Sequence, residues 1–270
     1  MQVLITGCTS GIGRALTAAF QERGDTVWAT GQRLAELERI AAEDGWGRVE
    51  LRTLDVTDAD AWDRVVSEME SSGRSPDVVC NVAGYLLPAL VEATTVRDVD
   101  LHIDVNVKGV ILGTRRCAQS MLAAGRGHII NIASLAGMSA VPGLSLYSAS
   151  KFAVRGFSLS VAQELRGRGV AVTVVCPDAV QTPMLDLQLD YEESALVFSG
   201  ARALSTADVC AAITGRVLRD RPLEVALPGW RGVLARIGGA APGVAAASEP
   251  LLRRVGRLNL ERARRARSGV

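Results

Sequence analysis

The chain contains 270 residues with a net charge of +1 at pH 7, and 48% of its residues are hydrophobic. This composition is typical of a globular domain with a large core, and it excludes a disordered or fibrous chain. The balanced charge gives no indication of a nucleic-acid partner, and no run of about twenty apolar residues indicates a membrane span.

Short apolar segments alternate with longer helical patterns over residues 1–227. Strands are expected at residues 3–5, 26–30, 49–54, 77–81, 128–133, 170–176 and 223–227. Helices are expected at about residues 11–23, 34–42, 57–72, 99–124, 147–168 and 205–219. Strands that alternate with helices imply parallel βαβ units joined by right-handed crossovers. The predicted fold class is therefore α/β, with a Rossmann-type, doubly wound, mainly parallel sheet and helices on both faces.

A glycine-rich turn joins the first predicted strand to the first predicted helix. Gly7, Gly11 and Gly13 have the spacing GxxxGxG, which differs from the more familiar GxGxxG but serves the same physics. Glycines permit a tight turn and a close approach of the backbone to a pyrophosphate at a helix N-terminus. An ordinary strand-to-helix turn is the alternative interpretation of these glycines alone.

Polar or glycine-containing turns also follow the third and fourth predicted strands. Asp55 and Val56 follow the third strand, and the sequence Asn81-Val82-Ala83-Gly84 ends the fourth. In an open α/β sheet, ligands bind at the carboxyl ends of the strands near the point where the strand order reverses. Taken singly, Asp55 is more often a helix-capping carboxylate, and Asn81 is more often a turn residue. Together with the glycine turn they predict a dinucleotide site.

A tyrosine and a lysine stand four residues apart at the start of the helix predicted at 147–168. Tyr147 and Lys151 therefore share one helix face. A nearby ammonium favours the phenolate, so the pair is a plausible general acid/base for a carbonyl or alcohol oxygen. Ser134 follows the fifth strand, where its hydroxyl could hold the same oxygen. Asn106 lies inside a predicted helix although Asn is a poor helix former, which suggests a polar role such as binding a water.

These motifs together resemble those of the short-chain dehydrogenases/reductases. The segments TGCTSGIG at 6–13, NVAG at 81–84 and YSASK at 147–151, with Asn106 and Ser134, have that family's order and spacing over about residues 1–227. The resemblance implies a seven-stranded Rossmann-type sheet and an oxidoreductase that interconverts an alcohol and a ketone or aldehyde with NAD(H) or NADP(H). It implies that Tyr147 exchanges the substrate proton and that Lys151 binds the nicotinamide ribose and lowers the pKa of Tyr147. Ser134 would orient the substrate oxygen, and Asn106 would anchor a proton-relay water.

The resemblance also implies which residues contact the cofactor. They are Gly7, Ser10, Gly11, Ile12, Gly13, Arg33, Asp55, Val56, Asn81, Ala83, Gly84, Tyr147, Lys151, Pro177, Val180 and Thr182. The chain departs from the family pattern at two places. Val82 replaces the second Asn of the usual NNAG, and Asp178 replaces the glycine that usually follows Pro177, which leaves the loop near the nicotinamide without its permissive glycine.

The end of the second predicted strand bears on the choice of cofactor. An acid at this point binds the ribose hydroxyls of NAD, whereas an Arg accommodates the phosphate of NADP. No acid is present between Ala29 and Arg33. The absence of an acid and the presence of Arg33 favour NADP(H). NAD(H) stays possible, because Gln32 stands where relatives commonly have Arg and Ser10 is uncharged. Arg33 is also as easily a solvated residue of the next helix.

A predicted substrate lid over residues 178–204 carries many apolar side chains. They are Met184, Leu185, Leu187, Leu189, Leu196, Val197 and Phe198. A lid of this composition suggests a lipophilic alcohol or ketone, although lids in any enzyme need apolar residues to close.

The composition changes after residue 227, so a catalytic domain is expected over 1–227 and a separate segment over 228–270. Residues 228–250 are rich in Gly, Ala and Pro, whereas residues 251–267 place Leu and Val at helical spacing among seven arginines. This basic amphipathic tail could contact an anionic membrane, pack on a partner subunit or be a solvated helix. A membrane contact would fit a lipid substrate resembling 3-ketosphinganine or retinal.

Two other classes of protein remain open from the sequence. The first is a nucleotide-binding regulatory or scaffold protein without activity, although Ser134, Tyr147, Lys151 and Asn106 are all present. The second is an epimerase or dehydratase of the extended branch, which the short chain and the GxxxGxG spacing disfavour. Five scattered cysteines without a CxxC pair, and an N-terminus unlike a signal peptide, predict a cytoplasmic protein. No metal site is expected, and the resemblance implies a homodimer or homotetramer.

Overall fold

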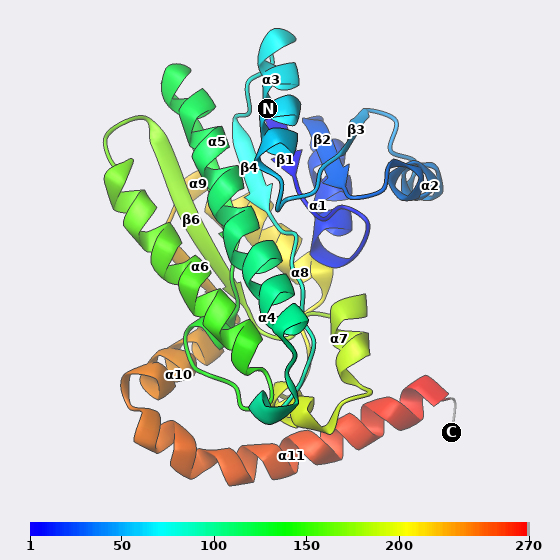
Figure 1. Cartoon of the computed structure of the whole chain (residues 1–270), viewed down its shortest axis with the longest axis vertical. Helices are drawn as coiled ribbons and strands as arrows, with labels where there is room; N and C mark the ends of the chain where they lie inside the picture. The colour runs from blue at the N-terminus through cyan, green and yellow to red at the C-terminus, as the bar shows by residue number, and fades with distance from the viewer. Residues whose placement is uncertain (269–270) are drawn as a thin grey trace.

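Seven parallel strands form the central sheet of the computed structural model, which describes residues 1–268 (Figure 1). The strands are β1 (Gln2–Ile5), β2 (Thr26–Gly31), β3 (Val49–Thr53), β4 (Val78–Asn81), β5 (Gly127–Ile132), β6 (Val170–Pro177) and β7 (Glu224–Leu227). Their order is β3-β2-β1-β4-β5-β6-β7, and every neighbouring pair is parallel. The predicted doubly wound α/β fold with seven strands is confirmed.

The strand order reverses between β1 and β4, which places the glycine turn and the NVAG turn side by side. Val3 pairs with Val78 and Ile5 with Cys80, so both strands end at the same level of the sheet. Ligands of open α/β sheets bind at such a reversal, outside the carboxyl ends of the strands. The topology therefore positions the two loops that the sequence assigns to a dinucleotide.

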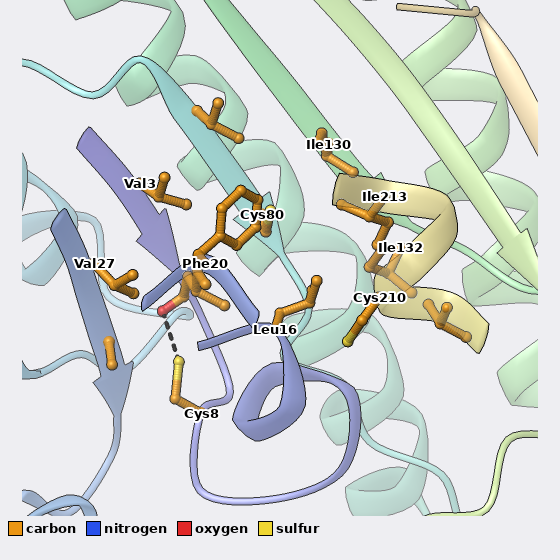
Figure 2. Packing of buried hydrophobic residues seen from close by; sticks show 14 of the residues in the cluster. Val3, Cys8, Leu16, Phe20, Val27, Cys80, Ile130, Ile132, Cys210 and Ile213 are labelled. Carbon is orange, nitrogen blue, oxygen red and sulfur yellow. Dashed lines mark hydrogen bonds between the residues drawn. The ribbon is translucent and has the colours of Figure 1, made fainter. Parts of the chain in front are cut away.

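Helices cover both faces of the sheet because successive strand residues point to opposite sides. Val3 belongs to a cluster with Leu16 and Phe20 of α1 (Gly11–Glu22), as Figure 2 shows, whereas its neighbour Leu4 packs with Trp62 on the other face. The first face is covered by α1, α2 (Leu34–Asp44) and α8 (Thr206–Ala212), and the second by α3 (Ala59–Ser71), α5 (Gly109–Ala123) and α6 (Ser145–Glu164).

All five cysteines are buried and none forms a disulfide. Burial raises the pKa of Cys8 to about 12, and its Sγ donates a hydrogen bond to the Ile5 carbonyl oxygen at 3.2 Å (Figure 2). Thiols with such a raised pKa stay protonated at neutral pH and act as small apolar side chains.

Two predicted helices are interrupted by π-helical turns. The helix expected at 99–124 is α4 (Val96–Ile103), a π-helical turn over Asp104–Lys108, and then α5. The helix expected at 205–219 is α8, a π-helical turn over Ile213–Val217, and the short α9 (Leu218–Asp220). The first interruption contains Asn106, and π-helical turns are frequent at functional sites.

The segment after residue 227 is helical and packs against the rest of the chain. It forms α10 (Gly229–Ala240), beside β7, and α11 (Pro242–Ser268), which runs along one end of the molecule in Figure 1. A Cβ on Gly232 would lie 2.2 Å from the Ala226 Cβ, so α10 lies directly on β7. A Cβ on Gly256 would lie 2.0 Å from the Ala195 carbonyl oxygen, so α11 lies equally close to η4 (Glu192–Ser199).

The apolar residues of the predicted amphipathic tail divide between two faces of α11. Leu260 is 1% exposed and packs against Leu189 and Ala195, whereas Leu251 and Leu258 are exposed. The arginines divide in the same way, because Arg264 and Arg267 turn inward to the acidic residues beside η4. Over residues 1–268, no helix combines the length and the apolar character that crossing a membrane requires.

Candidate active site

A cavity of about 1530 Å³ opens at the carboxyl ends of the strands. Its walls come from the loops that follow β1 to β6, from the start of α6, from the predicted lid, and from α10 and α11. Pockets for one small molecule usually measure about 300–1,000 Å³. This cavity is therefore large enough for a dinucleotide together with a substrate.

The glycine turn forms a cradle that only glycine can line. Gly7 has a φ of +71°, and a Cβ on Gly13 would lie 2.2 Å from the Gly7 carbonyl oxygen. Ser10 precedes α1 without capping it through its side chain, so the first backbone N–H groups of α1 stay available to a ligand. An uncapped helix N-terminus behind a glycine turn suits a pyrophosphate, and the residues present therefore fit a dinucleotide.

Thr6 fixes the distance between the glycine turn and the NVAG turn. Its Oγ1 accepts hydrogen bonds from the backbone N–H groups of Val82, at 2.9 Å, and Ala83, at 3.0 Å. Val82, at the position where the family pattern has a second Asn, lines the cavity and packs against the core under β1. Sequence reasoning missed Thr6, although a Thr that directly precedes the turn was its signal.

Tyr147, Ser134 and Lys151 all line the cavity. Tyr147 and Lys151 lie one turn apart on α6, and the Lys151 Nζ is 5.5 Å from the centroid of the Tyr147 ring. Ser134 follows β5, its Oγ accepts a hydrogen bond from the Ala136 backbone N–H at 3.1 Å, and its hydroxyl is hydrogen-bonded to Tyr147. The structure thus brings together two hydroxyl groups and an ammonium group at one point of the cavity wall.

The sequence led us to expect that Lys151 lowers the pKa of Tyr147. In this structure the pKa of Tyr147 is instead raised. Burial raises the pKa of Tyr147 to about 12, and the hydrogen bond with Ser134 offsets only part of that rise. Burial also lowers the pKa of Lys151 to about 8, and its Nζ donates to the Ile132 carbonyl oxygen at 3.0 Å. Desolvation disfavours both charged forms, so Tyr147 is a neutral phenol at pH 7.

Asn106 is fully buried and lies behind the cavity wall. Its Oδ1 accepts from the Tyr85 backbone N–H at 2.7 Å, and its Nδ2 donates to the Tyr85 carbonyl oxygen at 2.8 Å and to the Ser150 Oγ at 3.0 Å. The Ser150 Oγ in turn donates to the Tyr147 carbonyl oxygen at 2.7 Å. Asn106 therefore ties the loop after β4 to the first turns of α6, and its role as an anchor for a water stays a prediction.

The structure does not place Asp55 or Asn81 in the cavity wall. The Asp55 Oδ1 accepts from the backbone N–H of Thr57 at 2.9 Å and from its hydroxyl at 2.8 Å. The Asn81 Nδ2 donates to the Asn131 Oδ1 at 2.8 Å within the core. The other residues that the resemblance assigned to the cofactor do line the cavity, from Gly7 to Thr182.

The predicted lid contains α7 (Pro183–Gln188) and η4, and its apolar residues make two sets of contacts. Met184, Leu185, Leu196 and Val197 line the cavity. Leu189 and Phe198 instead pack with Leu260 of α11, and the Asn259 Nδ2 donates to the Phe198 carbonyl oxygen at 2.9 Å. The C-terminal helix therefore holds the lid in place.

The C-terminal helices also supply part of the cavity wall, which the sequence did not predict. Arg231 of α10 forms an ion pair with Asp178, the residue in place of the family's glycine. Asp178 does not have the positive φ that would favour glycine, since Arg221 is the one non-glycine residue with a positive φ within the described part of the chain. The backbone at Asp178 therefore needs no glycine. Its backbone N–H donates to the Leu227 carbonyl oxygen at 2.7 Å. The departure from the family pattern thus fastens the loop after β6 to α10.

Removing the Arg231 side chain (Arg231→Ala) should destabilise the protein by roughly 1–3 kcal/mol and raise KM more than it lowers kcat. Asp178 would lose its cation while burial still raises the pKa of its carboxyl group, and the loop over the cavity would loosen. Urea unfolding and steady-state kinetics measure both effects. The matched control is Arg236→Ala on the same helix, where the Arg236 side chain is half exposed and its partner Glu224 keeps a second ion pair with Arg155, so the loss should be less than about 1 kcal/mol. Equal effects of the two variants would contradict this prediction.

A family model described as short chain dehydrogenase matches residues 1–192. The chain is 37% identical over 185 residues to the 3-oxoacyl-acyl-carrier-protein reductase of Thermotoga maritima, covering 68% of this chain and 75% of that protein. It is 35% identical over 219 residues to the NADP-dependent 3-hydroxy acid dehydrogenase of Salmonella typhi, covering 79% of this chain and 87% of that protein.

Two solved structures share both the fold and part of the sequence. A serine dehydrogenase complexed with NADP⁺ superposes with a TM-score of 0.75 at 30% identity, covering 84% of this chain and 94% of that one. A short-chain dehydrogenase from Streptomyces avermitilis superposes with a TM-score of 0.78 at 29% identity, covering 92% of this chain and 94% of that one.

Proposed function

The chain belongs to the short-chain dehydrogenase/reductase family, and from that premise we propose that it interconverts a lipophilic alcohol and its ketone or aldehyde with NADP(H). The observation that carries this proposal is one cavity that joins the Gly7–Gly13 cradle to the hydroxyl groups of Tyr147 and Ser134. The bound nicotinamide would supply or accept the hydride.

The residues of the chain would handle the substrate oxygen and its proton. With a pKa of about 12, Tyr147 holds its proton at neutral pH and can donate it to the oxygen of a ketone as that oxygen gains charge. Ser134 would hold the same oxygen beside the phenol. Lys151 uses one of its three donors for the Ile132 carbonyl oxygen and can offer the others to ribose hydroxyl groups.

The charges of the cavity favour a neutral substrate. Away from the nucleotide cradle and Lys151, the charged residues that line it are Asp178, Arg231 and Glu249. Arg231 pairs with Asp178, and Glu249 pairs with Arg253. No unpaired cation among the lining residues there is placed to hold a substrate carboxylate, whereas apolar residues of the lid and of α10 and α11 are abundant. Ketones or alcohols with an apolar body should therefore be preferred to hydroxy acids.

Fluorescence titration with NADPH and NADH, followed by turnover with a panel of carbonyl compounds, tests this proposal. Tighter binding of NADPH and reduction of lipophilic ketones would support it. Binding without turnover of any carbonyl compound would indicate a nucleotide-binding protein without this activity. If neither nucleotide bound, the proposed function would be wrong.

Replacing Arg33 with alanine should weaken NADPH binding about fivefold and leave NADH binding unchanged. Arg33 lines the cavity beside the end of β2, where its guanidinium pairs with Glu36 at 2.7 Å, and its side chain is 78% exposed. A solvated contact with the NADP phosphate contributes about 1 kcal/mol, which sets the size of the effect. Arg39→Ala, an exposed residue of α2, the helix that Arg33 precedes, is the matched control. An Arg33→Ala variant that bound both nucleotides like the parent would remove Arg33 from the phosphate site.

A further inference from the structure

The outer face of α10 carries large apolar side chains that no part of the described chain covers. Trp230, Val233, Leu234 and Ile237 are each more than half exposed. They lie opposite Gly232, through which α10 packs on β7. Trp230 is the one exposed tryptophan of the four in the chain, because Trp28, Trp46 and Trp62 are buried.

The outer face of α11 continues this pattern. Val244, Leu251, Leu252, Val255 and Leu258 are all exposed. Residues 251, 255 and 258 have the i, i+4, i+7 spacing of one helix face, and this face points away from the face that contacts η4. The exposed apolar residues of α10 and α11 are together called the C-terminal apolar surface. Figure 1 shows α10 and α11 at the same end of the molecule.

The arginines of α11 are sorted by face. On the inner face, Arg264 pairs with Glu192 and Arg267 with Asp190. On the outer face, Arg254, Arg257 and Arg262 are exposed, and none of them forms an ion pair with a carboxylate of residues 1–268. Glu261 is the one acidic residue between positions 250 and 268. The C-terminal apolar surface is therefore bordered by positive charge.

The C-terminal apolar surface is continuous with the rim of the catalytic cavity. Leu234, Ile237, Val244 and Leu252 line the cavity and are at the same time between 42% and 60% exposed. These four apolar residues belong to both the surface and the cavity wall. An apolar molecule could therefore pass from the surface into the cavity along apolar side chains.

We propose that the C-terminal apolar surface docks on the face of an anionic lipid bilayer and that the cavity takes its lipophilic substrate from that bilayer. The uptake of substrate rests on the proposed function, whereas the docking does not. Apolar helix faces bordered by Arg bind such surfaces, because lipid headgroups attract the arginines while the apolar side chains enter the acyl boundary. Tryptophan is enriched at the same boundary, where Trp230 would lie.

The charge pattern favours a lipid surface over a second copy of the chain. In a two-fold dimer the same patch meets itself. A two-fold contact through α11 would bring Arg254, Arg257 and Arg262 of both copies into one interface. Between positions 250 and 268 the sequence supplies one acidic residue, Glu261, to pair with them. Anionic headgroups complement the same charges.

Vesicle binding tests the docking in full-length protein, with phosphatidylcholine vesicles that contain or lack phosphatidylserine. We expect cosedimentation with the anionic vesicles alone, a blue shift of Trp230 fluorescence, quenching by brominated lipids, and loss of binding at high salt. The triple variant Arg254→Gln, Arg257→Gln, Arg262→Gln should bind about 100-fold more weakly, because each Arg near the surface contributes about fivefold. The triple variant Arg39→Gln, Arg64→Gln, Arg74→Gln has the same change of charge away from the surface and should bind like the parent.

Three outcomes would overturn the docking. The first is absence of binding to anionic vesicles, and the second is equal binding by the Arg254/Arg257/Arg262 variant and the parent. The third is a concentration-dependent dimer that Leu258→Glu dissociates, together with Trp230 fluorescence that vesicles leave unchanged. Turnover of a water-soluble ketone is measured in parallel. Turnover without vesicle binding would refute the docking alone, and vesicle binding without nucleotide binding would refute the proposed function alone.

Discussion

Replacing Tyr147 with phenylalanine should lower the turnover of a carbonyl substrate by roughly 10²–10⁴-fold, the usual contribution of a general acid or base. The variant keeps the ring that Lys151 approaches at 5.5 Å and removes only the hydroxyl group that is hydrogen-bonded to Ser134. NADPH affinity should change by less than about threefold, because the glycine cradle lies on other elements. Stopped-flow reduction and a nucleotide titration measure the two quantities.

Tyr191→Phe is the matched control for this experiment. Tyr191 lies in the lid, does not line the cavity, and precedes η4. We expect this variant to keep parental turnover. A Tyr147→Phe variant that kept more than about a tenth of parental turnover would contradict the assignment of Tyr147 as the proton donor.

Adding a single methyl group at Gly13 should weaken nucleotide binding strongly. The Cβ of Gly13→Ala would lie 2.2 Å from the Gly7 carbonyl oxygen and 3.1 Å from that of Thr6, and both are backbone atoms that cannot rotate away. Overpacking of this kind costs about 1–3 kcal/mol, and displacement of the loop should weaken NADPH binding by about 10- to 100-fold. Isothermal titration measures the affinity, and urea unfolding measures the free energy of unfolding.

Gly156→Ala provides the control for this substitution. Gly156 is exposed within α6, and its Cβ would meet no atom within 4 Å. This variant should bind NADPH like the parent and gain up to about 1 kcal/mol in stability from better helix propensity. Equal NADPH affinity of the two variants would show that the cradle does not approach the nucleotide.

The order and type of the sheet elements could be predicted because their signals are local. β6, for example, is rich in β-branched residues between Val170 and Val175, and such residues favour a strand. The helix interruption at Asn106 could not be predicted in detail. It depends on the hydrogen bonds of Asn106 to Tyr85 and Ser150, which lie on other elements.

The candidate site could be predicted where backbone geometry defines it and less well where side chains do. Gly7 and Gly13 are required by close backbone contacts, so their position in the sequence is sufficient. Asp55 and Asn81 have the expected positions, but Thr57 and Asn131 hold their side chains away from the cavity. A motif specifies where a residue stands and not which neighbour takes its hydrogen bonds.

The part played by the C-terminal segment could not be predicted because its contacts join distant parts of the chain. Leu260 and Leu258 have similar sequence surroundings, yet Leu260 is buried against Leu189 while Leu258 is exposed. The ion pair of Arg231 with Asp178 spans more than fifty residues and turns a departure from the family pattern into a tertiary contact. Periodicity detects such a helix but not the face that packs.

The most direct test of the proposed chemistry is the transfer of deuterium from NADPH labelled at the transferable position to a lipophilic ketone. We predict that mass spectrometry will find one deuterium on the carbinol carbon of the product with the parent protein, and at least about 100-fold less of this labelled product with Tyr147→Phe under the same conditions. The proposed function would be contradicted if NADPH bound the parent protein but no deuterium were transferred to any ketone or aldehyde of the panel.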